Sequence, residues 1–337
     1  MTKSVKVALD AMGGDAGPSA VVPAAQKILA TNKDLCLYLV GKQEVIKPLL
    51  NGSENRFGDR LQIVDAREVV AMDESPADAL RKKKNSSLRV SIDLVKSGDA
   101  DACVSSGNTG ALMATARFVL KTLPGIDRPA IMTAVPTIHD HAHMLDLGAN
   151  SDCTSEHLFQ FAVMGSVVAS VVENIPNPKI GLLNIGSEEM KGNDTIRQAA
   201  ALLAETDLNY IGFVEGNDIA TQKADVIVCD GFSGNVALKS MEGTAHLFRH
   251  FLKKEFKRSL YGKLAGLISL PVLLSLSRSL DPRRYNGASL VGLNGIVIKS
   301  HGGADAMAFK QAIETAIVEV EKGVPDKIHQ LLAQQEH

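Results

Sequence analysis

The sequence predicts an α/β protein whose mainly parallel sheet is covered by helices on both faces, in three layers. Short apolar, strand-like runs alternate along the chain with segments whose apolar residues recur every three or four positions. Seven apolar runs stop at Gly beside Asn, Asp, Ser or His, and in most cases a helical pattern begins at once. With 337 residues, 45% of them apolar and 22% charged, the chain is long enough for one large domain or two lobes.

Strands and helices are expected in alternation from the first residues to the last. The expected strands are Val5–Leu9, Cys36–Val40, Leu61–Val64, Ala102–Val104, Ala130–Val135, Met144–Leu147, Ile180–Asn184, Ile211–Val214, Val226–Cys229 and Gly295–Lys299. The expected helices lie near Pro18–Ala30, Leu88–Lys96, Gly110–Leu120, Ser155–Glu173, Thr195–Glu205, Val236–Lys257 and Ala304–Lys322.

A second lobe is expected in the middle of the chain, because residues 124–129 and 281–287 are the stretches richest in Pro and Gly. The expected lobes are 1–125 together with 288–337, and 126–287, the latter including an apolar and basic helical segment near 250–280.

Charge and cysteine content exclude several classes of protein. A net charge of -2 argues against a general nucleic-acid binder, which would be basic. The four cysteines are scattered without metal-ligand spacing, which is typical of a reducing cytosol. The chain enters a strand pattern directly, and no run reaches the roughly 20 apolar residues of a spanning helix. We therefore expect a cytoplasmic protein that is neither secreted nor membrane-spanning.

The Gly-containing junctions are the expected ligand site. They are Asp10–Asp15, Ser105–Gly110, Asp146–Asn150, Asn184–Gly186, Glu215–Asp218, Asp230–Asn235 and Ser300–Gly303. Ligands bind at strand ends of open α/β sheets, and helix N-termini present free N–H groups to anions. A tight turn explains any one junction, but the set predicts a site for a phosphate-like group. Neither a G-x-G-x-x-G nor a P-loop pattern is present.

Ten junction residues are expected to bind substrate: Asp10, Gly13, Gly14, Gly107, Asn108, Thr109, Asn150, Gly192, Asn193 and Gly234. An asparagine amide can donate to a phosphate or thioester oxygen, but Asn also caps helices and tolerates left-handed turns, so a structural role is the default. Asn108 and Asn235 are favoured as ligands over Asn150.

Three residues are expected to be catalytic: Lys191, Asn235 and His301. Lys191 lies between a strand and a helix, where its ammonium could neutralise phosphate or the oxyanion of a tetrahedral intermediate. The alternative is a solvated lysine paired with Glu188 or Glu189. His301 follows the last strand and could protonate a leaving thiolate or hold an anion, although a strand-capping role is nearly as well supported.

No metal, cofactor or covalent serine is expected. His139, His141 and His143 alternate around Asp140, but without an acidic partner cluster such alternation is more typical of exposed polar surface. Ser233 resembles a nucleophile elbow but lacks the second glycine.

Two basic segments, 81–84 and 253–258, are either solvated faces or surfaces that steer an acidic partner. The second leads into an apolar stretch, 264–276, that is too short to span a membrane. This stretch suits a dimer interface, a lipid surface or a buried helix pair, and the sequence leaves all three open. The expected membrane or partner contacts are Leu264, Leu267, Ile268 and Leu273.

Eight motifs occur in one order along nearly the whole chain: "DAMGGD" at Asp10, "KKKNSS" at Lys82, "GNTGA" at Gly107, "DLGAN" at Asp146, "NIGSEEMKGN" at Asn184, "GFVEGNDI" at Gly212, "DGFSGN" at Asp230 and "SHGGADA" at Ser300. In these motifs the chain resembles the bacterial PlsX family, the phosphate acyltransferases of phospholipid synthesis. One departure is Ser106, where the family usually has Ala.

The resemblance implies an isocitrate-dehydrogenase-like or phosphotransacetylase-like fold. It implies transfer of a fatty acyl group from acyl-[acyl carrier protein] to inorganic phosphate, giving acyl phosphate for glycerol-3-phosphate acylation. It also implies a homodimer that associates peripherally with the inner membrane, near the acyltransferase that consumes acyl phosphate. Acyl carrier proteins are acidic, which gives the basic segments a purpose.

This reaction fits the residues, because phosphate supplies its own nucleophilic oxygen. The protein then needs positioning, an oxyanion site and help for the leaving thiolate. Two alternatives remain. A decarboxylating dehydrogenase of the same fold would need aspartate and arginine clusters that the sequence lacks. A non-enzymatic, membrane-associated scaffold would leave the polar junctions without a purpose.

Overall fold

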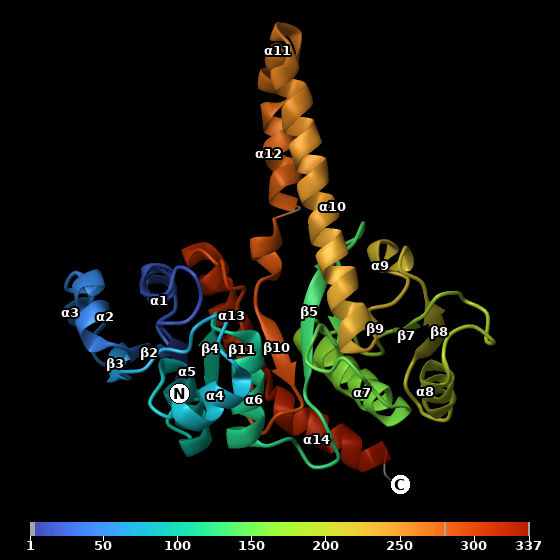
Figure 1. Cartoon of the computed structure of the whole chain (residues 1–337), viewed down its shortest axis with the longest axis horizontal. Coiled ribbons are helices and arrows are strands. Elements are labelled where there is room, and N and C mark those ends of the chain that lie inside the picture. Colours follow the sequence, from blue (N-terminus) through green and yellow to red (C-terminus); the bar gives the residue numbers. More distant parts are fainter. Residues whose placement is uncertain (1–3, 280, 336–337) are drawn as a thin grey trace.

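One eleven-stranded sheet forms the centre of the molecule in the computed structural model, which describes residues 4–279 and 281–335 (Figure 1). Across the sheet the strands are β3 (Leu61–Asp65), β2 (Leu35–Gly41), β1 (Val5–Asp10), β4 (Ala102–Ser105), β11 (Ile296–Lys299), β10 (Ala288–Val291), β5 (Ala130–Pro136), β6 (His141–Leu145), β9 (Val226–Val228), β7 (Ile180–Leu183) and β8 (Tyr210–Val214).

The sheet consists of two parallel blocks joined by antiparallel strands. β3, β2, β1, β4 and β11 are parallel neighbours, as are β6, β9, β7 and β8. The pairs β11–β10, β10–β5 and β5–β6 between them are antiparallel. The expected mainly parallel sheet is confirmed. Because parallel neighbours end at the same edge, the ends of β1, β4 and β11 form one group, and those of β6, β9 and β7 form another.

Helices cover both faces of the sheet. They are α1 (Pro18–Thr31), α2 (Gln43–Leu50), α3 (Ser53–Phe57), α4 (Pro76–Lys82), α5 (Ser87–Ser97), α6 (Thr109–Leu120), α7 (Ser155–Val172), α8 (Asp194–Ala204), α9 (Asp218–Thr221), α10 (Gly231–Arg258), α11 (Leu260–Ile268), α12 (Leu270–Ser279), α13 (Ala306–Lys322) and α14 (Val324–Gln335), with 3-10 turns η1 (Gly58–Arg60) and η2 (Pro282–Tyr285).

Alternation along the strands builds the three layers. Val7 and Leu9 of β1 pack in the apolar cluster that contains α1 and α13, whereas Ala8 points to the opposite face, where it packs with residues of α5. In the second block α7, α8 and α14 share a cluster with inward residues of β5, β6, β7 and β9. These strands are buried on both faces, which explains their nearly continuous apolar sequences.

All ten expected strands and all seven expected helices are present, with shifted ends. The expectation that no run suits a membrane span is wrong by length and composition, because α7 is long and apolar enough. Most of α7 is nevertheless buried inside the protein, where it packs on β6, β9 and α14. A core helix passes the same test.

The strands of each expected lobe lie side by side in the sheet, which continues across both halves. One segment departs from the expected division. The last helix, α14, belongs by sequence to the first lobe, but Val324, Ile328 and Leu332 pack in the core of the second. The lobe boundaries themselves stay a prediction.

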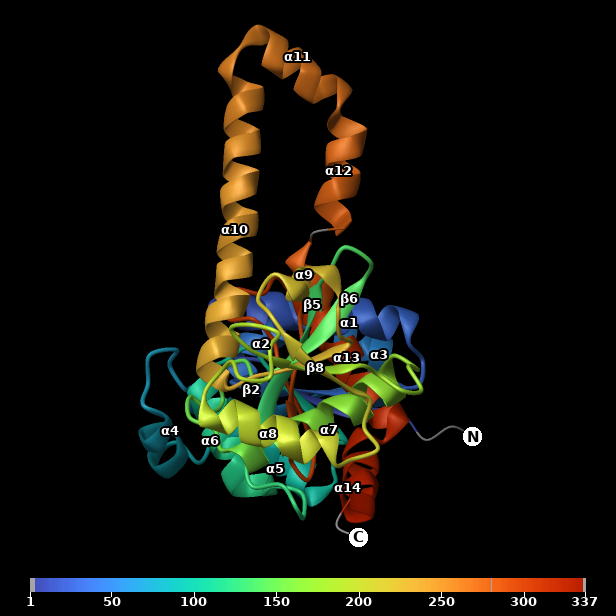
Figure 2. The same ribbon diagram turned by 90° about the vertical axis from the view of Figure 1, so that its right-hand side faces the viewer.

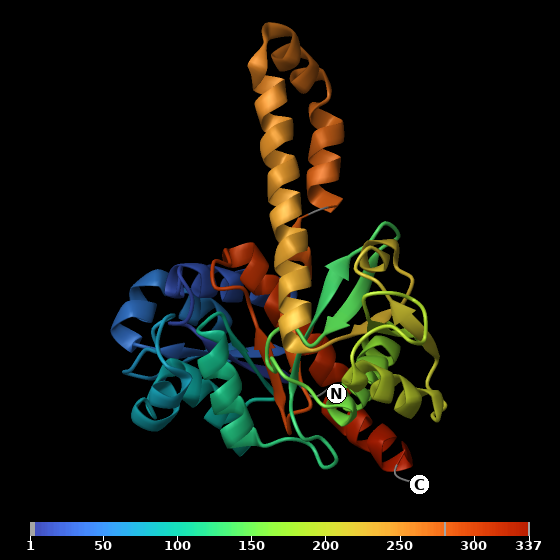
Figure 3. The ribbon, with the colours of Figure 1, turned by 45° about the vertical axis from the view of Figure 1, so that its right-hand side comes forward.

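A helical hairpin made of α10, α11 and α12 projects from the body (Figures 1 and 2). Figure 3 shows the same projection from a third direction. The alternative of a buried helix pair is wrong, because Leu264, Leu267 and Ile268 are 58%, 67% and 73% exposed. Leu273 is partly covered.

Candidate functional site

Three strand-end loops meet in the first block, after β1, β4 and β11. The Ser106 hydroxyl donates to the carbonyl oxygen of Gly13 (2.8 Å), and the Asp15 N–H donates to that of Gly302 (2.9 Å). The Ser300 N–H donates to the carbonyl oxygen of Ser105 (2.9 Å). We call these loops with their adjoining residues, 10–15, 105–109 and 299–303, the first loop group.

Glycine is required in this group because the backbones are in close contact. A Cβ atom on Gly13 would lie 2.7 Å from the Gly107 nitrogen. One on Gly14, whose φ is +79°, would lie 2.8 Å from the Gly302 oxygen. Both contacts are shorter than real Cβ atoms tolerate, so Gly13 and Gly14 permit loop packing. Direct contact of Gly13, Gly14 and Gly107 with substrate stays a prediction.

Asp10 is buried beneath the loops rather than exposed to a ligand. Its carboxylate accepts from the Ser105 hydroxyl (2.6 Å) and from the Met12 N–H (3.3 Å). Burial raises the pKa of Asp10, while these hydrogen bonds lower it. Asp10 thus holds the β1 and β4 ends together beneath the loops, and its expected contact with substrate stays a prediction.

Lys299 is a residue of this group that the sequence reasoning missed. It is 8% exposed, and its ammonium donates to the carbonyl oxygens of Ser106 (3.4 Å) and Ser300. Burial lowers the pKa of Lys299 to about 8. The sequence feature that could have identified Lys299 is its place at the end of an otherwise apolar strand, because a charged residue in such a run is expected to be buried with the strand.

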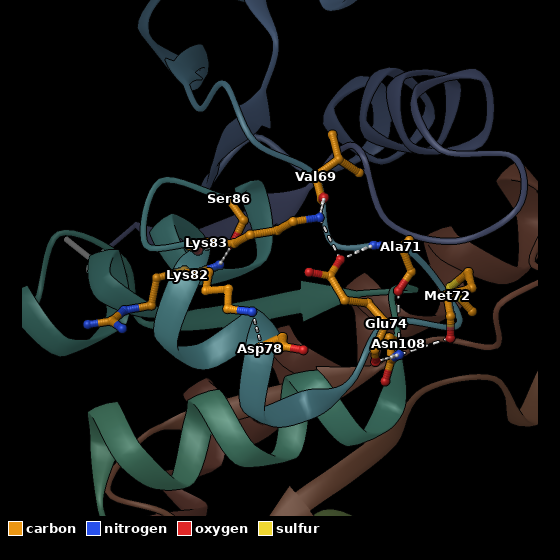
Figure 4. A network of polar contacts seen from close by, with 10 residues as sticks. Val69, Ala71, Met72, Glu74, Asp78, Lys82, Lys83, Ser86 and Asn108 are labelled. Carbon is orange, nitrogen blue, oxygen red and sulfur yellow. Dashed lines mark hydrogen bonds and ion pairs between the residues drawn. The ribbon is translucent and has the colours of Figure 1, made fainter.

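Asn108 has a structural role that its position did not reveal (Figure 4). Its side-chain oxygen accepts from Ala111 N–H (3.0 Å) and caps α6, and its amide donates to the carbonyl oxygens of Met72 and Glu74 (both 2.9 Å). Glu74 in turn pairs with Lys83 (2.5 Å). The amide thus holds residues 71–74, and the assignment of Asn108 as a phosphate ligand stays a prediction.

Thr109 and His301 lie at the exposed side of the first loop group. Thr109 is the exposed first residue of α6, where helix N–H groups are directed outward. His301 is also exposed, and its Nδ1 accepts from the Gly303 N–H (3.0 Å). This bond places the ring proton on Nε2, so neutral His301 can donate a hydrogen bond outward.

The loops after β6 and β9, residues 146–150 and 230–235, form the second loop group. The buried carboxylate of Asp146 organises it. This carboxylate accepts from the N–H groups of Ile131 (2.9 Å), Ala149 (3.1 Å) and Asn150 (2.7 Å) and from the Asn150 amide (2.9 Å). The Asn150 amide also donates to Pro129 (2.9 Å). Asn150 is therefore buried and holds this loop, and its expected substrate contact stays a prediction.

The N-terminus of α10 packs on this loop. Asp230 caps the helix by accepting from the Ser233 N–H (2.8 Å) and hydroxyl (2.8 Å), so Ser233 is not held as a nucleophile. A Cβ on Gly234 would lie 2.0 Å from the backbone carbonyl oxygen of Asp146, so a glycine here lets the helix pack closely on the loop. Asn235, half-buried beside Gly148, makes no side-chain hydrogen bond with any residue in the described ranges.

Lys191 lies in an exposed loop between β7 and α8. Its backbone carbonyl accepts from the Asn184 amide (3.2 Å). Gly192 has φ +90° and packs on the Asn184 side chain. Asn193 caps α8, because its side-chain oxygen accepts from the Ile196 N–H (2.9 Å). Within residues 4–279 and 281–335 the Lys191 ammonium forms no ion pair, so the expected alternative of a pair with Glu188 or Glu189 is wrong.

Three of the four cysteines are not prepared as nucleophiles. Burial raises the pKa of Cys103 and Cys229 well above the ordinary value and that of Cys153 to about 11. These thiols stay protonated near neutral pH. An attacking oxygen supplied by a substrate is consistent with this arrangement.

The expectation that His141 and His143 are exposed and lack an acidic partner is wrong. His143 is buried and His141 is half-buried. The Glu173 carboxylate lies 3.3 Å from the Nε2 atom of His143 and 3.4 Å from that of His141. His139 is exposed, as expected.

The two loop groups lie in different halves of the sheet. The first holds Asp10, Gly13, Gly14, Gly107, Asn108, Thr109 and His301, and the second holds Asn150, Gly234 and Asn235, with Lys191, Gly192 and Asn193 after neighbouring β7. No hydrogen bond or ion pair joins the groups among the residues that the structure describes. The helices that follow them, α6 and α10, share one apolar cluster.

Comparisons with known proteins agree with this architecture. The family described as "Fatty acid synthesis protein" matches residues 5–327. Proteins named phosphate acyltransferase from Alkalilimnicola ehrlichii and Methylococcus capsulatus are 62% and 60% identical, over 98% and 96% of this chain and 97% and 95% of theirs. A phosphotransacetylase from Streptococcus pyogenes superimposes with a TM-score of 0.61 at 21% identity, covering 96% of this chain and 95% of that one.

The fold is therefore phosphotransacetylase-like, as expected. Together with the relatives it defines the class of protein: an enzyme that transfers an acyl group to phosphate. The chain belongs to the phosphate acyltransferase family of fatty acid and phospholipid synthesis. The non-enzymatic scaffold and the decarboxylating dehydrogenase are thereby set aside.

Proposed function

We propose that this enzyme transfers a fatty acyl group from acyl-[acyl carrier protein] to inorganic phosphate, and that the acyl phosphate product serves glycerol-3-phosphate acylation. The observation that carries the site assignment is that two polar groups, the Lys191 ammonium after β7 and the Asn235 amide near the start of α10, have no side-chain partner among the described residues. An unpaired cation and an unpaired amide at strand ends are suited to an anion.

The proposed chemistry is attack by a phosphate oxygen on the thioester carbon. Asn235 and the exposed N-terminus of α6 at Thr109 bind phosphate, and Lys191 stabilises the oxyanion of the tetrahedral intermediate. The C–S bond then breaks, and the neutral Nε2–H group of His301 donates a hydrogen bond to the leaving thiolate, which takes its proton from water. The buried, protonated thiols of Cys103, Cys153 and Cys229 and the hydrogen bond from Ser233 to Asp230 support direct attack rather than an acyl-enzyme at these residues.

The carrier protein is proposed to bind through exposed cations. Arg81 and Lys84 are exposed and make no ion pair with any residue that the structure describes, whereas Lys82 and Lys83 are paired with Asp78 (2.7 Å) and Glu74 (2.5 Å). On α10, Lys253, Lys254 and Lys257 are likewise exposed and unpaired within the described ranges. These groups are free to meet acidic side chains.

The projecting hairpin is proposed to serve the membrane and the dimer. Its tip, around Leu264, Leu267 and Ile268, would insert shallowly into the inner membrane, near the downstream acyltransferase. Leu247 and Phe251 on α10, 56% and 51% exposed, would contact a second copy of the chain. This assigns the enzyme to the cytoplasm, with peripheral attachment.

The test is formation of hydroxylamine-trappable acyl phosphate from palmitoyl-[acyl carrier protein] and phosphate. Lys191→Ala should lower kcat by about 100-fold or more, the usual effect of removing one oxyanion donor. Lys33→Ala, an exposed lysine elsewhere, is the matched control. Near-normal turnover by folded Lys191→Ala would reject the assigned role of this lysine. Turnover with palmitoyl-CoA but not with the carrier-bound donor would reject the proposed donor.

A further inference from the structure

A cluster of metal-ligating side chains lies away from both loop groups, at the start of β6. His141 and His143 are two residues apart on this strand, so they lie on the same side of the sheet. Glu173, the C-cap of α7, lies against them. One potential ligand atom from each residue lies within 4.8 Å of the other two.

The spacing of these atoms matches a coordination sphere. The Glu173 Oε1 atom is 3.4 Å from His141 Nε2 and 3.3 Å from His143 Nε2. Zinc bonds to imidazole nitrogen and carboxylate oxygen are about 2.0–2.1 Å, which places adjacent ligands of a tetrahedral ion about 3.3 Å apart. Two of the three ligand pairs therefore have the required separation, and the atoms of the third pair, the two imidazole nitrogens, lie within 4.8 Å of each other.

A second, independent feature is the partner on the far side of His141. Its Nδ1 atom lies 3.3 Å from Asp140 Oδ1. A carboxylate on the other ring nitrogen is the outer partner that usually orients a metal-bound histidine and leaves Nε2 free for the ion. His143 is 8% exposed, so its ring is held in place by packing. Few side chains here need to be ordered before an ion binds.

We propose that His141, His143 and Glu173 bind one divalent transition-metal ion, with zinc the best match, and that the ion ties the β5–β6 hairpin to the end of α7. Two imidazoles and one carboxylate suit zinc or cobalt rather than magnesium or calcium. The fourth position would be left to water. This inference goes beyond the proposed acyl transfer and does not depend on it.

The competing occupant of the same space is a proton. Glu173 and then Asp140 raise the pKa of His141 to about 9, because both carboxylates stabilise the imidazolium. A bound metal must displace that proton. The experiment therefore has to detect the ion itself and not only the integrity of the cluster.

The test uses the purified full-length enzyme after chelator treatment. Cobalt is added and its visible spectrum recorded, zinc affinity is measured by competition with a chromogenic chelator, and Tm is measured with and without zinc. The variants are Glu173→Gln and the double change His141→Ala with His143→Ala. The matched control is His246→Ala with His250→Ala, an exposed histidine pair four residues apart on α10 that could bind metal adventitiously.

We expect one equivalent of cobalt to give the intense absorption of a tetrahedral site and zinc to raise Tm. Zinc affinity should fall at least tenfold in both cluster variants and stay unchanged in the α10 control. Only a weak, octahedral-type spectrum, or loss of binding confined to the α10 control, would overturn the proposal. If the cluster variants fail to fold, X-ray absorption of the zinc-loaded His246→Ala with His250→Ala variant decides, since fewer than two imidazole ligands contradicts the site.

Discussion

At the scale of single residues, the strand-end loops depend on glycines at positions where an added Cβ atom would clash with neighbouring atoms. Gly234 lies in the first turn of α10, where an added Cβ would be 2.0 Å from the Asp146 oxygen and 2.8 Å from the Cys229 sulfur. Gly243, in the same helix, has no atom within 4 Å of such a Cβ. The two glycines therefore differ in what they contribute, although each occupies one helical position.

We expect Gly234→Ala to lower the free energy of unfolding by about 1–3 kcal/mol, because the loop or the helix must move to relieve the contact. Gly243→Ala is the control and should raise it by up to about 1 kcal/mol, since alanine is the better helix former. Urea denaturation of both variants measures the difference. Equal effects of the two substitutions would show that the Asp146 loop yields easily.

Glu319 of α13 is a buried carboxyl that makes stability depend on pH. It is 4% exposed, accepts from the Ser289 hydroxyl (3.1 Å), and burial raises its pKa from 4.5 to about 7. Between pH 4.5 and pH 7 the folded state thus keeps a proton on Glu319 that the unfolded state has already lost. Stability from this residue is fully present below pH 4.5 and falls until pH 7.

Wild type should therefore lose about 2–3 kcal/mol relative to Glu319→Gln between pH 5 and pH 8, since each pKa unit corresponds to about 1.4 kcal/mol. Denaturation curves at both pH values measure this loss. Glu321→Gln, an exposed neighbour, is the control and should run parallel to wild type. A constant gap between wild type and Glu319→Gln would mean that Glu319 is ionised throughout.

At the scale of elements, periodicity located the helices and strands that carry strong apolar patterns. It missed β10, whose four residues Ala288–Val291 include a serine and follow a glycine. It also missed α14, which is separated from α13 by only Gly323. Short elements are positioned by their neighbours: β10 exists because β5 and β11 supply partners on both sides.

For the site, the sequence located the strand-end junctions but not what each side chain does there. Glycine and asparagine serve turns, caps and ligands alike, so Asn108 and Asn150 could not be separated from Asn235 before their hydrogen bonds were known. Glu173 is 30 residues from His143, and a contact over that separation leaves no local pattern.

The α10–α12 hairpin is the element whose composition contradicts its exposure. We expect wild type to sediment with anionic vesicles and Leu267→Asp with Ile268→Asp to bind at least tenfold more weakly, because burying each side chain contributes about 1.5–3 kcal/mol. The control is Leu49→Asp on α2, because Leu49 is also exposed, at 38%, but lies away from the hairpin. Vesicle binding that survives the tip variant would place the contact elsewhere.

At the scale of the whole molecule, a net charge of -2 gives no general attraction to an acidic carrier protein. Any attraction has to be local, and our proposal places it on two surfaces whose cations form no ion pair among the described residues, one with Arg81 and Lys84 and one with Lys253, Lys254 and Lys257. Salt screens such contacts, since the Debye length falls from about 10 Å at 0.1 M to about 3 Å at 1 M.

The Kd for the acyl carrier protein should therefore rise several-fold between about 0.05 and 0.5 M NaCl, as measured by fluorescence anisotropy. Substituting alanine for Lys253, Lys254 and Lys257 should weaken binding and flatten this salt dependence if the hairpin is the docking surface. The Arg81→Ala with Lys84→Ala variant tests the other surface in the same way, and Lys33→Ala serves as the control. A salt dependence that neither variant changes would mean that the carrier protein binds outside both surfaces.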